Sequence, residues 1–449
     1  MALSRNRRAA LAWTAWLGAF AAAAGTAWTA SAEPLSPMGT APQAPQPLTL
    51  DAAVRAALAQ NPSIIAARQE HGIAAAGVMV ARAYPFNPVW EGRFRYAWPV
   101  SAGATNQEPV ENTVTLEMEV RGQHAHRMAQ AQAALSRADW EIASQEISLA
   151  VRVVRAFDAV VYRYQKNQHV LDTIKLDQDT FNQAQDLVKA QKLKPSDLII
   201  LRTEIDDARA QLGASRTALA TASSELHSAL GVIGGSFALH GDLCLPPLPE
   251  GEAEALAETA RANRPDRHAR EAAVAEADAA LRLERANRFG NPVVGPTYEY
   301  DNSSIHNLGV QFALPLPVLN AHRSDILQRE AEKERAVLEL RQTDVEIGQD
   351  VEAALVRLKQ AQAWVETYER DVLPDLQKSL KEMQDLFNQG SPDVTALAIL
   401  DVQRKVLTAR DGYLDARFEV RQAVADLAAA LGDPCIAVGP CAAPPAPNP

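Results

Sequence analysis

The fold predicted for this chain is decided by residues 205–231, IDDARAQLGASRTALATASSELHSALG. Large apolar residues and small residues alternate there at steps of three and four, which is the heptad pattern of a helix that packs along a second helix. The residues in this pattern are Ile205, Ala208, Leu212, Ser215, Leu219, Ala222, Leu226 and Ala229. A small residue opposite a large one lets two helix backbones approach closely. We therefore predict a coiled-coil helix that ends at Gly231.

The same pattern returns 201 residues later, in VLTARDGYLDARFEVRQAVADLAAALG, residues 406–432. Its members are Val406, Ala409, Tyr413, Ala416, Val420, Ala423, Leu427 and Ala430. Both stretches end in Ala-Leu-Gly. Because register, length and terminator all recur, we predict two internal repeats rather than two unrelated amphipathic helices.

Each repeat also contains two segments in which the period changes from helical to alternating. Apolar residues at every second position are typical of a strand with one apolar face. These residues are Trp90, Gly92, Phe94, Tyr96, Trp98, Val114, Leu116, Met118 and Val120 in the first repeat, and Val294, Pro296, Tyr298, Tyr300, Leu308, Val310, Phe312 and Leu314 in the second. A two-stranded hairpin is therefore predicted in each repeat.

A very long helix is predicted before each heptad helix. Neither proline nor glycine interrupts the pattern from about His126 to Lys189, and a helix of that length reaches roughly 90–100 Å. The second long helix runs from His322 to about Asn388 and crosses Pro374, where we expect a kink or local unwinding. Each long helix and the heptad helix after it form a helical hairpin.

These patterns divide the chain into five parts. We predict a signal peptide (1–32), an extended Pro-rich arm (33–47), a first repeat (48–250), a second repeat (251–432) and a tail (433–449), the first repeat ending in an irregular segment. The strand pairs fall at about 89–121 and 293–314, and the helical hairpins at about 126–231 and 322–432.

The N-terminal segment has the features of an export signal. Arg5, Arg7 and Arg8 precede an apolar run at 9–24, and Ala30-Ser31-Ala32 is a small-residue cleavage site. The alternative is an uncleaved membrane anchor, but the apolar run is short and contains polar residues.

Composition excludes several functions. The net charge of −11, without a clustered basic stripe, argues against nucleic acid as a partner. The mean hydropathy of −0.17 excludes a polytopic helical membrane protein. The sequence contains no Gly-rich phosphate loop, nucleophile elbow or metalloprotease motif, so we predict neither an enzyme nor a bound cofactor.

Two sets of residues leave alternatives open. Export makes one disulfide plausible among three cysteines, so Cys244–Cys435, Cys435–Cys441 and free thiols are all compatible with the sequence. Four histidines lie near strand–helix junctions: His124, His126, His306 and His322. We predict that these are ordinary polar residues and not a metal site, because no cysteine or carboxylate spacing accompanies them.

The predicted fold class is mainly α-helical with a small β part. Four strands per chain are too few to close a barrel, and an open sheet cannot lie in lipid. Three chains would supply about 12 strands, which makes a workable transmembrane β-barrel, while the long coiled-coil hairpins would form an α-barrel. We therefore predict a homotrimer in a lipid membrane, with Trp90, Tyr96 and Trp98 at the membrane interface. The alternative is a soluble sheet that covers the end of a coiled coil.

The opening LDAAVRAALAQNP, residues 50–62, is similar to the recurring first-helix motif of the TolC family of outer-membrane channels. The doubled organisation, the Ala-Leu-Gly helix ends and the hairpin positions also resemble that family, over about residues 48–432. Residues 312–320, FALPLPVLN, resemble its metal-efflux branch, which serves resistance-nodulation-division pumps. Residues 120–124, VRGQH, depart from the more glycine-rich, basic turn usual in that branch.

This resemblance implies a passive trimeric exit duct in the outer membrane, with a large periplasmic portion. Heavy-metal cations would reach it from an inner-membrane pump through a periplasmic adaptor protein. The alternatives are a duct for organic compounds or for type I protein secretion, a periplasmic coiled-coil adaptor, and a soluble coiled-coil scaffold. An adaptor would need a lipoyl-like or barrel domain beside one hairpin, and here each of two hairpins has a strand pair.

The resemblance also implies a gate and docking turns. Leu400-Asp401-Val402 matches the family's gate segment, and three copies of Asp401 would form an acidic ring that attracts cations. Asp197 is a second, weaker gate candidate, and the alternative for Asp401 is a solvated charge on a helix surface. The adaptor is expected to dock on the two hairpin turns, at Gln191, Lys192, Lys194, Pro195, Gln389, Gly390, Ser391 and Pro392.

Overall fold

The computed structural model describes residues 48–96, 109–189, 194–235, 241–249, 251–300, 305–318, 321–388 and 396–439. Several predicted features lie outside these residues. They are the signal peptide and the arm, Trp98, Gln191, Lys192, Gln389, Gly390, Ser391, Pro392 and Cys441. In the described part of the chain, no helix has both the length and the apolar character needed to cross a membrane.

Each half of the chain has the same order of elements. The first half contains α2 (Leu50–Gln60), α3 (Pro62–Arg82), β1 (Val89–Phe94), β2 (Val110–Glu117), α4 (Gln123–Lys189) and α5 (Pro195–Leu230). The second half contains α6 (Ala253–Asn263), α7 (Pro265–Asn287), β3 (Val293–Tyr300), β4 (His306–Ala313), α8 (Arg323–Thr367), a π-helix η1 (Tyr368–Val372), α9 (Leu373–Asn388), α10 (Ala396–Leu431) and α11 (Cys435–Val438). The fold is therefore mainly helical with a small sheet, as predicted.

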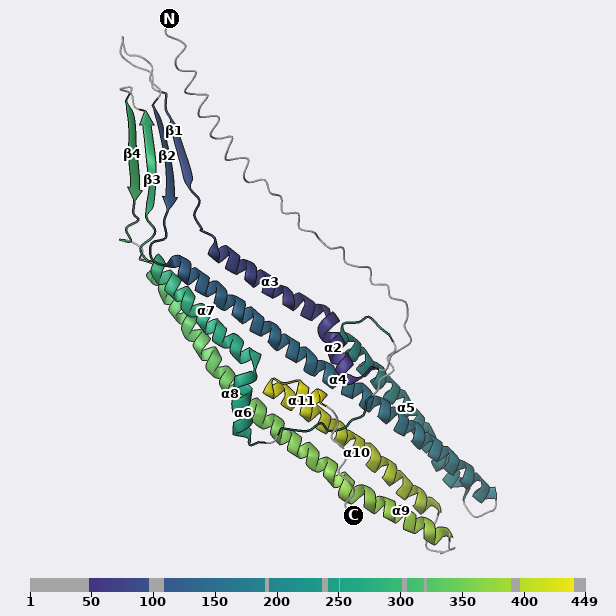
Figure 1. The fold of residues 1–449 in the computed structure, drawn as a ribbon. Helices are drawn as coiled ribbons and strands as arrows, with labels where there is room; N and C mark the ends of the chain where they lie inside the picture. Colours follow the sequence, from purple (N-terminus) through teal and green to yellow (C-terminus); the bar gives the residue numbers. More distant parts are fainter. Residues whose placement is uncertain are drawn as a thin grey trace. The chain divides into compact units, whose positions relative to one another are not determined.

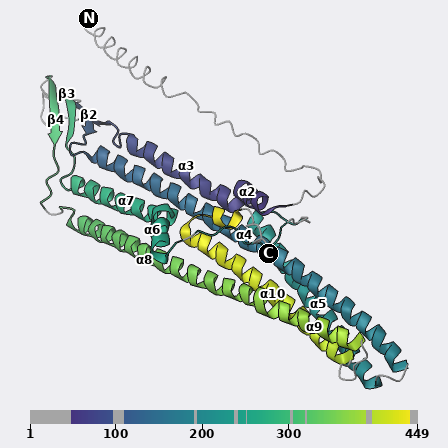
Figure 2. The ribbon, with the colours of Figure 1, turned by 60° about the horizontal axis from the view of Figure 1, so that its bottom comes forward.

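The helices pack as two long hairpins. At 67 residues, α4 is roughly 100 Å long. It packs against α3, α5, α7 and α10 (Figure 1), and α10 lies along α8 and α9 (Figure 2). Within both heptad helices the predicted positions face inward: most are buried, and Leu212, Ser215, Leu219 and Tyr413 are half-buried. The core lies where α4 and α10 meet, with α2, α5, α6, α8 and α11 packed around them.

The two heptad helices end in the same way. Gly231 follows α5 with a φ of +73°, and Gly432 follows α10 with a φ of +71°. In the first half, the buried Asn61 donates from Nδ2 to the carbonyl oxygen of Ala229 at 2.8 Å. A Cβ at Gly231 would lie 2.7 Å from Cδ of Pro62, so a larger residue would push the two helix ends apart. Glycine is thus required here for its left-handed backbone and for the close approach.

The second long helix is interrupted just before Pro374. The turn from Tyr368 to Val372 is a π-helix, which is the local unwinding predicted at this proline, whose ring cannot fit an uninterrupted α-helical ladder. Tyr368 lies over Gly412 of α10, where an added Cβ would be 2.4 Å from the tyrosine hydroxyl. Glu369 accepts a hydrogen bond from the Tyr413 hydroxyl at 2.5 Å, so the interruption places two side chains against α10.

The structure decides among the cysteine alternatives that the sequence left open. Cys435 has a free, exposed thiol, and Cys244 is disulfide-bonded. Neither the Cys244–Cys435 link nor the Cys435–Cys441 link, both left open by the sequence, is therefore present, and the alternative of three free thiols is excluded as well. The partner of Cys244 lies outside the described residues.

Candidate functional site

The four strands form one antiparallel sheet in the order β1-β2-β3-β4 (Figure 1). Paired residues lie on the same face, and each pair in this register joins two even-numbered or two odd-numbered residues. One face therefore bears Trp90, Gly92, Phe94, Val110, Asn112, Val114, Leu116, Val294, Pro296, Tyr298, Tyr300, His306, Leu308, Val310 and Phe312. The other face bears mostly Glu, Thr, Arg, Gln, Asn and Gly. The register thus places the apolar residues of all four strands on one face of the sheet.

This apolar face is strongly exposed in the single chain. Leu308 is 84% exposed and Val310 76%, and Trp90 and Tyr96, both predicted to lie at the membrane interface, are also exposed. A contiguous exposed apolar surface marks contact with a partner or with lipid. Because β1 and β4 are the two edges of the described sheet, their unpaired backbone groups can be satisfied by another copy of the chain.

The two helical hairpins are joined by ion pairs near the hairpin ends. Arg404 of α10 pairs with both carboxylate oxygens of Glu204 on α5, and this hydrogen bonding raises the pKa of the guanidinium. Asp177 of α4 lies nearby, and burial raises the pKa of its carboxyl group. These three residues line a groove of about 650 Å³ between α4, α5 and α10. The groove holds charges of both signs, and nothing in its arrangement resembles a catalytic set.

A second ion-pair group lies nearer the core. Lys166 of α4 contacts Asp415 at 2.9 Å and Asp411 at 3.2 Å, both on α10. The Tyr162 hydroxyl donates to Asp415 at 2.6 Å, and its ring stacks on Phe418 at 4.2 Å. Hydrogen bonds from Lys166 to its acidic and phenolic partners outweigh its burial and raise its pKa. The first and second hairpins are thus held together by charge as well as by the heptad packing.

The predicted gate residues are not brought together by any described contact. Asp401 lies on an exposed part of α10, with its side chain 64% exposed, and it pairs with Lys405 one turn later at 2.8 Å. Asp197 lies in the first turn of α5, and its side chain is outside the description. Of the predicted docking residues, Lys194 and Pro195 are described, and both are exposed at the start of α5.

Three of the four histidines near the strand–helix junctions have different partners, while His126 is half-buried on α4. His124 contacts the carbonyl oxygen of Arg82, and His306 lies on the sheet beside the Tyr298 hydroxyl. His322 instead meets two carboxylates: its Nδ1 lies 3.1 Å from Oε1 of Glu284 and 3.2 Å from Oδ2 of Asp325. Neither acid was predicted from the sequence as a partner of His322. The i, i+3 spacing of His322 and Asp325 was a visible signal, whereas Glu284 comes from another helix.

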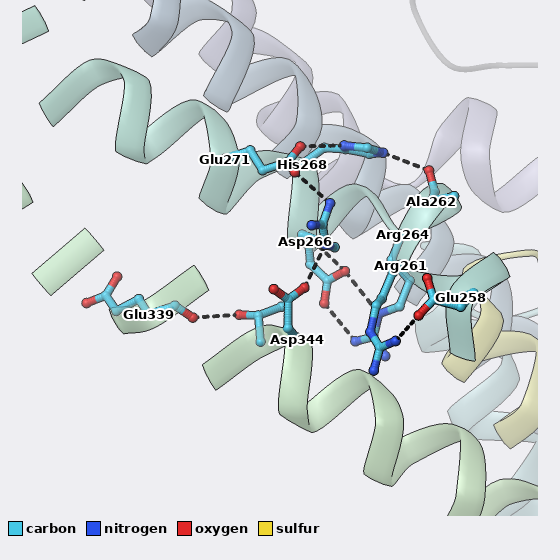
Figure 3. Close-up of polar contacts among 11 residues, drawn as sticks. Glu258, Arg261, Ala262, Arg264, Asp266, His268, Glu271, Glu339 and Asp344 are labelled. Atoms are coloured by element: carbon cyan, nitrogen blue, oxygen red, sulfur yellow. Dashed lines mark hydrogen bonds and ion pairs between the residues drawn. The ribbon is translucent and has the colours of Figure 1, made fainter. Parts of the chain in front are cut away.

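Arg264 lies between α6 and α7 and forms an ion pair with Asp266 (Figure 3). Its guanidinium bonds Asp266 at 2.7 Å and Asp350 of α8 at 2.9 Å, and it reaches the carbonyl oxygen of Ala430 at 3.5 Å. These hydrogen bonds outweigh burial and raise the pKa of Arg264. In the second repeat Arg264 contacts the end of α10, and in the first repeat Asn61 contacts the end of α5. The two repeats therefore use different side chains at equivalent positions.

The family model described as outer membrane efflux protein matches residues 53–232 and 256–433, one segment in each repeat. The chain belongs to the outer membrane efflux protein family. The resemblance noted in the sequence is thereby confirmed. Members of this family are channels and not enzymes, and the protein lies in the outer membrane with a large periplasmic portion.

Individual members of the family show the same relationship along nearly the whole chain. The cobalt-zinc-cadmium resistance protein CzcC of Cupriavidus metallidurans is 23% identical over 392 residues, which cover 87% of this chain and 91% of that protein. The crystal structure of CusC superposes with a TM-score of 0.70 at 19% identity, covering 86% of this chain and 92% of that one. VceC of Vibrio cholerae superposes with a TM-score of 0.68 at 15% identity, covering 86% and 96%. The fold of this outer membrane efflux protein is therefore that of the two solved structures.

Proposed function

We propose that three copies of this chain form a passive exit duct for heavy-metal cations. An inner-membrane resistance-nodulation-division pump would deliver the cations through a periplasmic adaptor protein. The observation that carries the metal cargo is the likeness to a cobalt-zinc-cadmium resistance protein over most of both chains. It is supported by the segment 312–320, which resembles the metal-efflux branch.

The cargo is tested with a deletion strain. Loss of the gene should sensitise cells to Co²⁺, Zn²⁺ or Cd²⁺, and the wild-type gene should restore growth, while sensitivity to organic compounds stays unchanged. Sensitivity to organic compounds alone, or a defect only in protein secretion, would assign the duct to one of the alternative cargoes.

The trimer is supported by the sheet. In the described part of the chain its apolar face is exposed and β1 and β4 are its two edges, and closing these edges with the β1 and β4 of neighbouring copies would give about 12 strands in a β-barrel. The apolar face would then meet lipid and the polar face a wet lumen. Trp90 and Tyr96 would lie at the membrane interface.

The edge pairing can be tested by cross-linking. Within one chain β1 and β4 are three strand spacings apart, or about 14 Å. Cysteines in place of Glu91 and Asn307, in a Cys435→Ser background, should therefore be joined by a reagent shorter than about 10 Å only when two copies lie side by side. We expect linked trimers from the double variant and none from either single variant. A double variant that stays monomeric in detergent would refute the trimer.

The gate is proposed at Asp401, with Asp197 as the weaker candidate. Asp401→Ala should alter cation selectivity or raise conductance in planar bilayers, because three carboxylates at a constriction attract cations. Asp206→Ala is a matched control, since Asp206 is similarly exposed (60%) and is also paired with a cation on its own helix, Arg209. If the two variants conduct alike, Asp401 does not belong to the gate.

The adaptor is proposed to dock on the hairpin turns. Lys194→Glu reverses an exposed charge beside Pro195 and should weaken adaptor binding, whereas Arg335→Glu, an exposed charge on α8, should not. Equal adaptor binding by both variants in a pull-down would place the docking surface elsewhere.

A further inference from the structure

The strand–helix junctions of the two repeats differ at one equivalent position. Gly122 accepts the first helical hydrogen bond of α4, from the amide of His126 at 3.1 Å, and its φ is +74°. His322 accepts the first helical hydrogen bond of α8, from the amide of Ile326 at 3.0 Å, and its φ is +53°. Both residues thus have a left-handed backbone conformation and directly precede a long helix. The first repeat uses glycine there, for which this backbone is unstrained, whereas the second uses histidine.

His322 is the non-glycine residue with a positive φ among the described residues. Its ring lies between two carboxylates from different helices, Glu284 of α7 and Asp325 of α8. We call Glu284, His322 and Asp325 the junction triad. One nitrogen, Nδ1, faces both acids, and one ligand atom from each of the three residues lies within 4.8 Å of the others. A single proton on Nδ1 cannot point well at both oxygens, whereas a cation can contact all three atoms.

We propose that the junction triad is a binding site for a divalent first-row transition cation such as Zn²⁺ or Co²⁺. The nitrogen-to-oxygen distances of 3.1 and 3.2 Å match the separation of about 3.0–3.4 Å between neighbouring ligands that each lie about 2.1 Å from one metal ion. An imidazole with two carboxylates suits Zn²⁺ or Co²⁺, whereas Mg²⁺ and Ca²⁺ prefer oxygen ligands alone and Cu⁺ prefers sulfur.

Burial and charge are compatible with this occupant. The side chain of Glu284 is 20% exposed, that of His322 38% and that of Asp325 52%, so the ligands are partly held in place while solvent can complete the coordination. The start of α8 carries a partial positive charge that opposes a cation, and the two carboxylates outweigh it. Without a metal, the same residues would simply cap α8 and form an ion pair, so the test must separate these two roles.

The first repeat provides an internal contrast. Three residues after Gly122 stands Ala125, where the second repeat has Asp325. There α3 and α4 are joined instead by Arg127, whose Nε donates to the carbonyl oxygen of Ala81 at 3.1 Å. The bound cation would join α7 to α8 in the second repeat, as this guanidinium joins α3 to α4 in the first. The site rests on this geometry and not on the proposed cargo.

The decisive variant is His322→Gly. It removes the imidazole and places at residue 322 the amino acid that the first repeat already uses there, so the fold should be kept. Purified full-length protein, in detergent, with a Cys435→Ser background and a histidine-free tag, is titrated with Co²⁺ and with Zn²⁺. We expect one saturable site per chain, a Co²⁺ absorption band in the visible range, and a rise in Tm with metal. His322→Gly and Glu284→Gln should each weaken binding at least tenfold and abolish the metal-dependent rise in Tm.

His71→Gln is the matched control, because His71 contacts one carboxylate, Asp139 at 2.6 Å, and is absent from the triad. This variant should bind metal like the starting protein. Metal binding by His322→Gly equal to that of His71→Gln would overturn the proposal, and so would a starting protein without a saturable site. Because binding is measured without a pump, a failure here leaves the export phenotype of the deletion strain, and with it the proposed function, untouched.

Discussion

Arg421 of α10 donates from Nε and Nη2 to the two carboxylate oxygens of Asp158 on α4, at 3.0 and 3.3 Å. The side chains are only 5% and 3% exposed, so the pair is almost completely buried. Arg421 also donates to the carbonyl oxygens of Cys244 and Ala437. One guanidinium therefore joins both long hairpins to the segment that contains the disulfide-bonded cysteine.

Removal of one partner of this pair should be costly. Arg421→Met leaves a buried, unpaired carboxylate, and we expect a loss of about 3–5 kcal/mol in the free energy of unfolding. The double variant Arg421→Met with Asp158→Leu should recover the part of that loss that comes from the unpaired carboxylate, whereas the carbonyl oxygens of Cys244 and Ala437 still lack their donor. Arg370→Ala, which breaks an exposed pair with Glu366, should cost far less, because solvent screens an exposed ion pair. Denaturant unfolding compares the four proteins, and equal losses from Arg421→Met and Arg370→Ala would contradict the prediction.

The middle of the sheet depends on a glycine. A Cβ at Gly295 would lie 1.8 Å from the carbonyl oxygen of Val114, because β2 and β3 approach closely beside Pro296. Gly295→Ala should therefore force the two strands apart and lower the yield of assembled protein in the outer membrane. Gly72→Ala on α3, where nothing lies within 4 Å, should not. Membrane fractionation measures both, and a normal yield for Gly295→Ala would show that the strands do not pack this closely.

The π-helix should be visible in a tyrosine titration. Burial and the hydrogen bond to Glu369 raise the pKa of Tyr413 to about 12. The pKa of Tyr413 in the folded protein is thus above the ordinary tyrosine value of about 10. The contribution of this hydrogen bond to the stability of the folded state is therefore fully present below pH 10 and is lost as pH rises towards 12. The difference in absorbance at 295 nm between the protein and Tyr413→Phe should titrate near pH 12, and Glu369→Gln should move it lower. A difference curve centred at pH 10, unaffected by Glu369→Gln, would be inconsistent with this contact.

The cysteine assignment predicts a simple thiol count. Cys435 is free and Cys244 is disulfide-bonded, and the chain contains three cysteines. Denatured, unreduced protein should therefore react with one maleimide per chain, and reduced protein with three. Mass spectrometry of the labelled peptide should find Cys435 modified before reduction. Three reactive thiols without a reductant would exclude the disulfide.

The sequence by itself determined the helices, the strand faces and the doubled order of elements. Heptad spacing and alternation are local periodicities, so they fix burial along the heptad helices, as at Ile205 and Ala416, and the face on which a strand residue lies, as at Phe312. Tertiary structure alone decided the contacts between distant residues. It joined Asp158 to Arg421, placed Glu284 beside His322, and left Cys435 unpaired. Tertiary structure also decided the strand register, which places all four apolar strand faces on one side of the sheet. Such contacts have no local spacing that reveals them, because they depend on how separate elements pack in space.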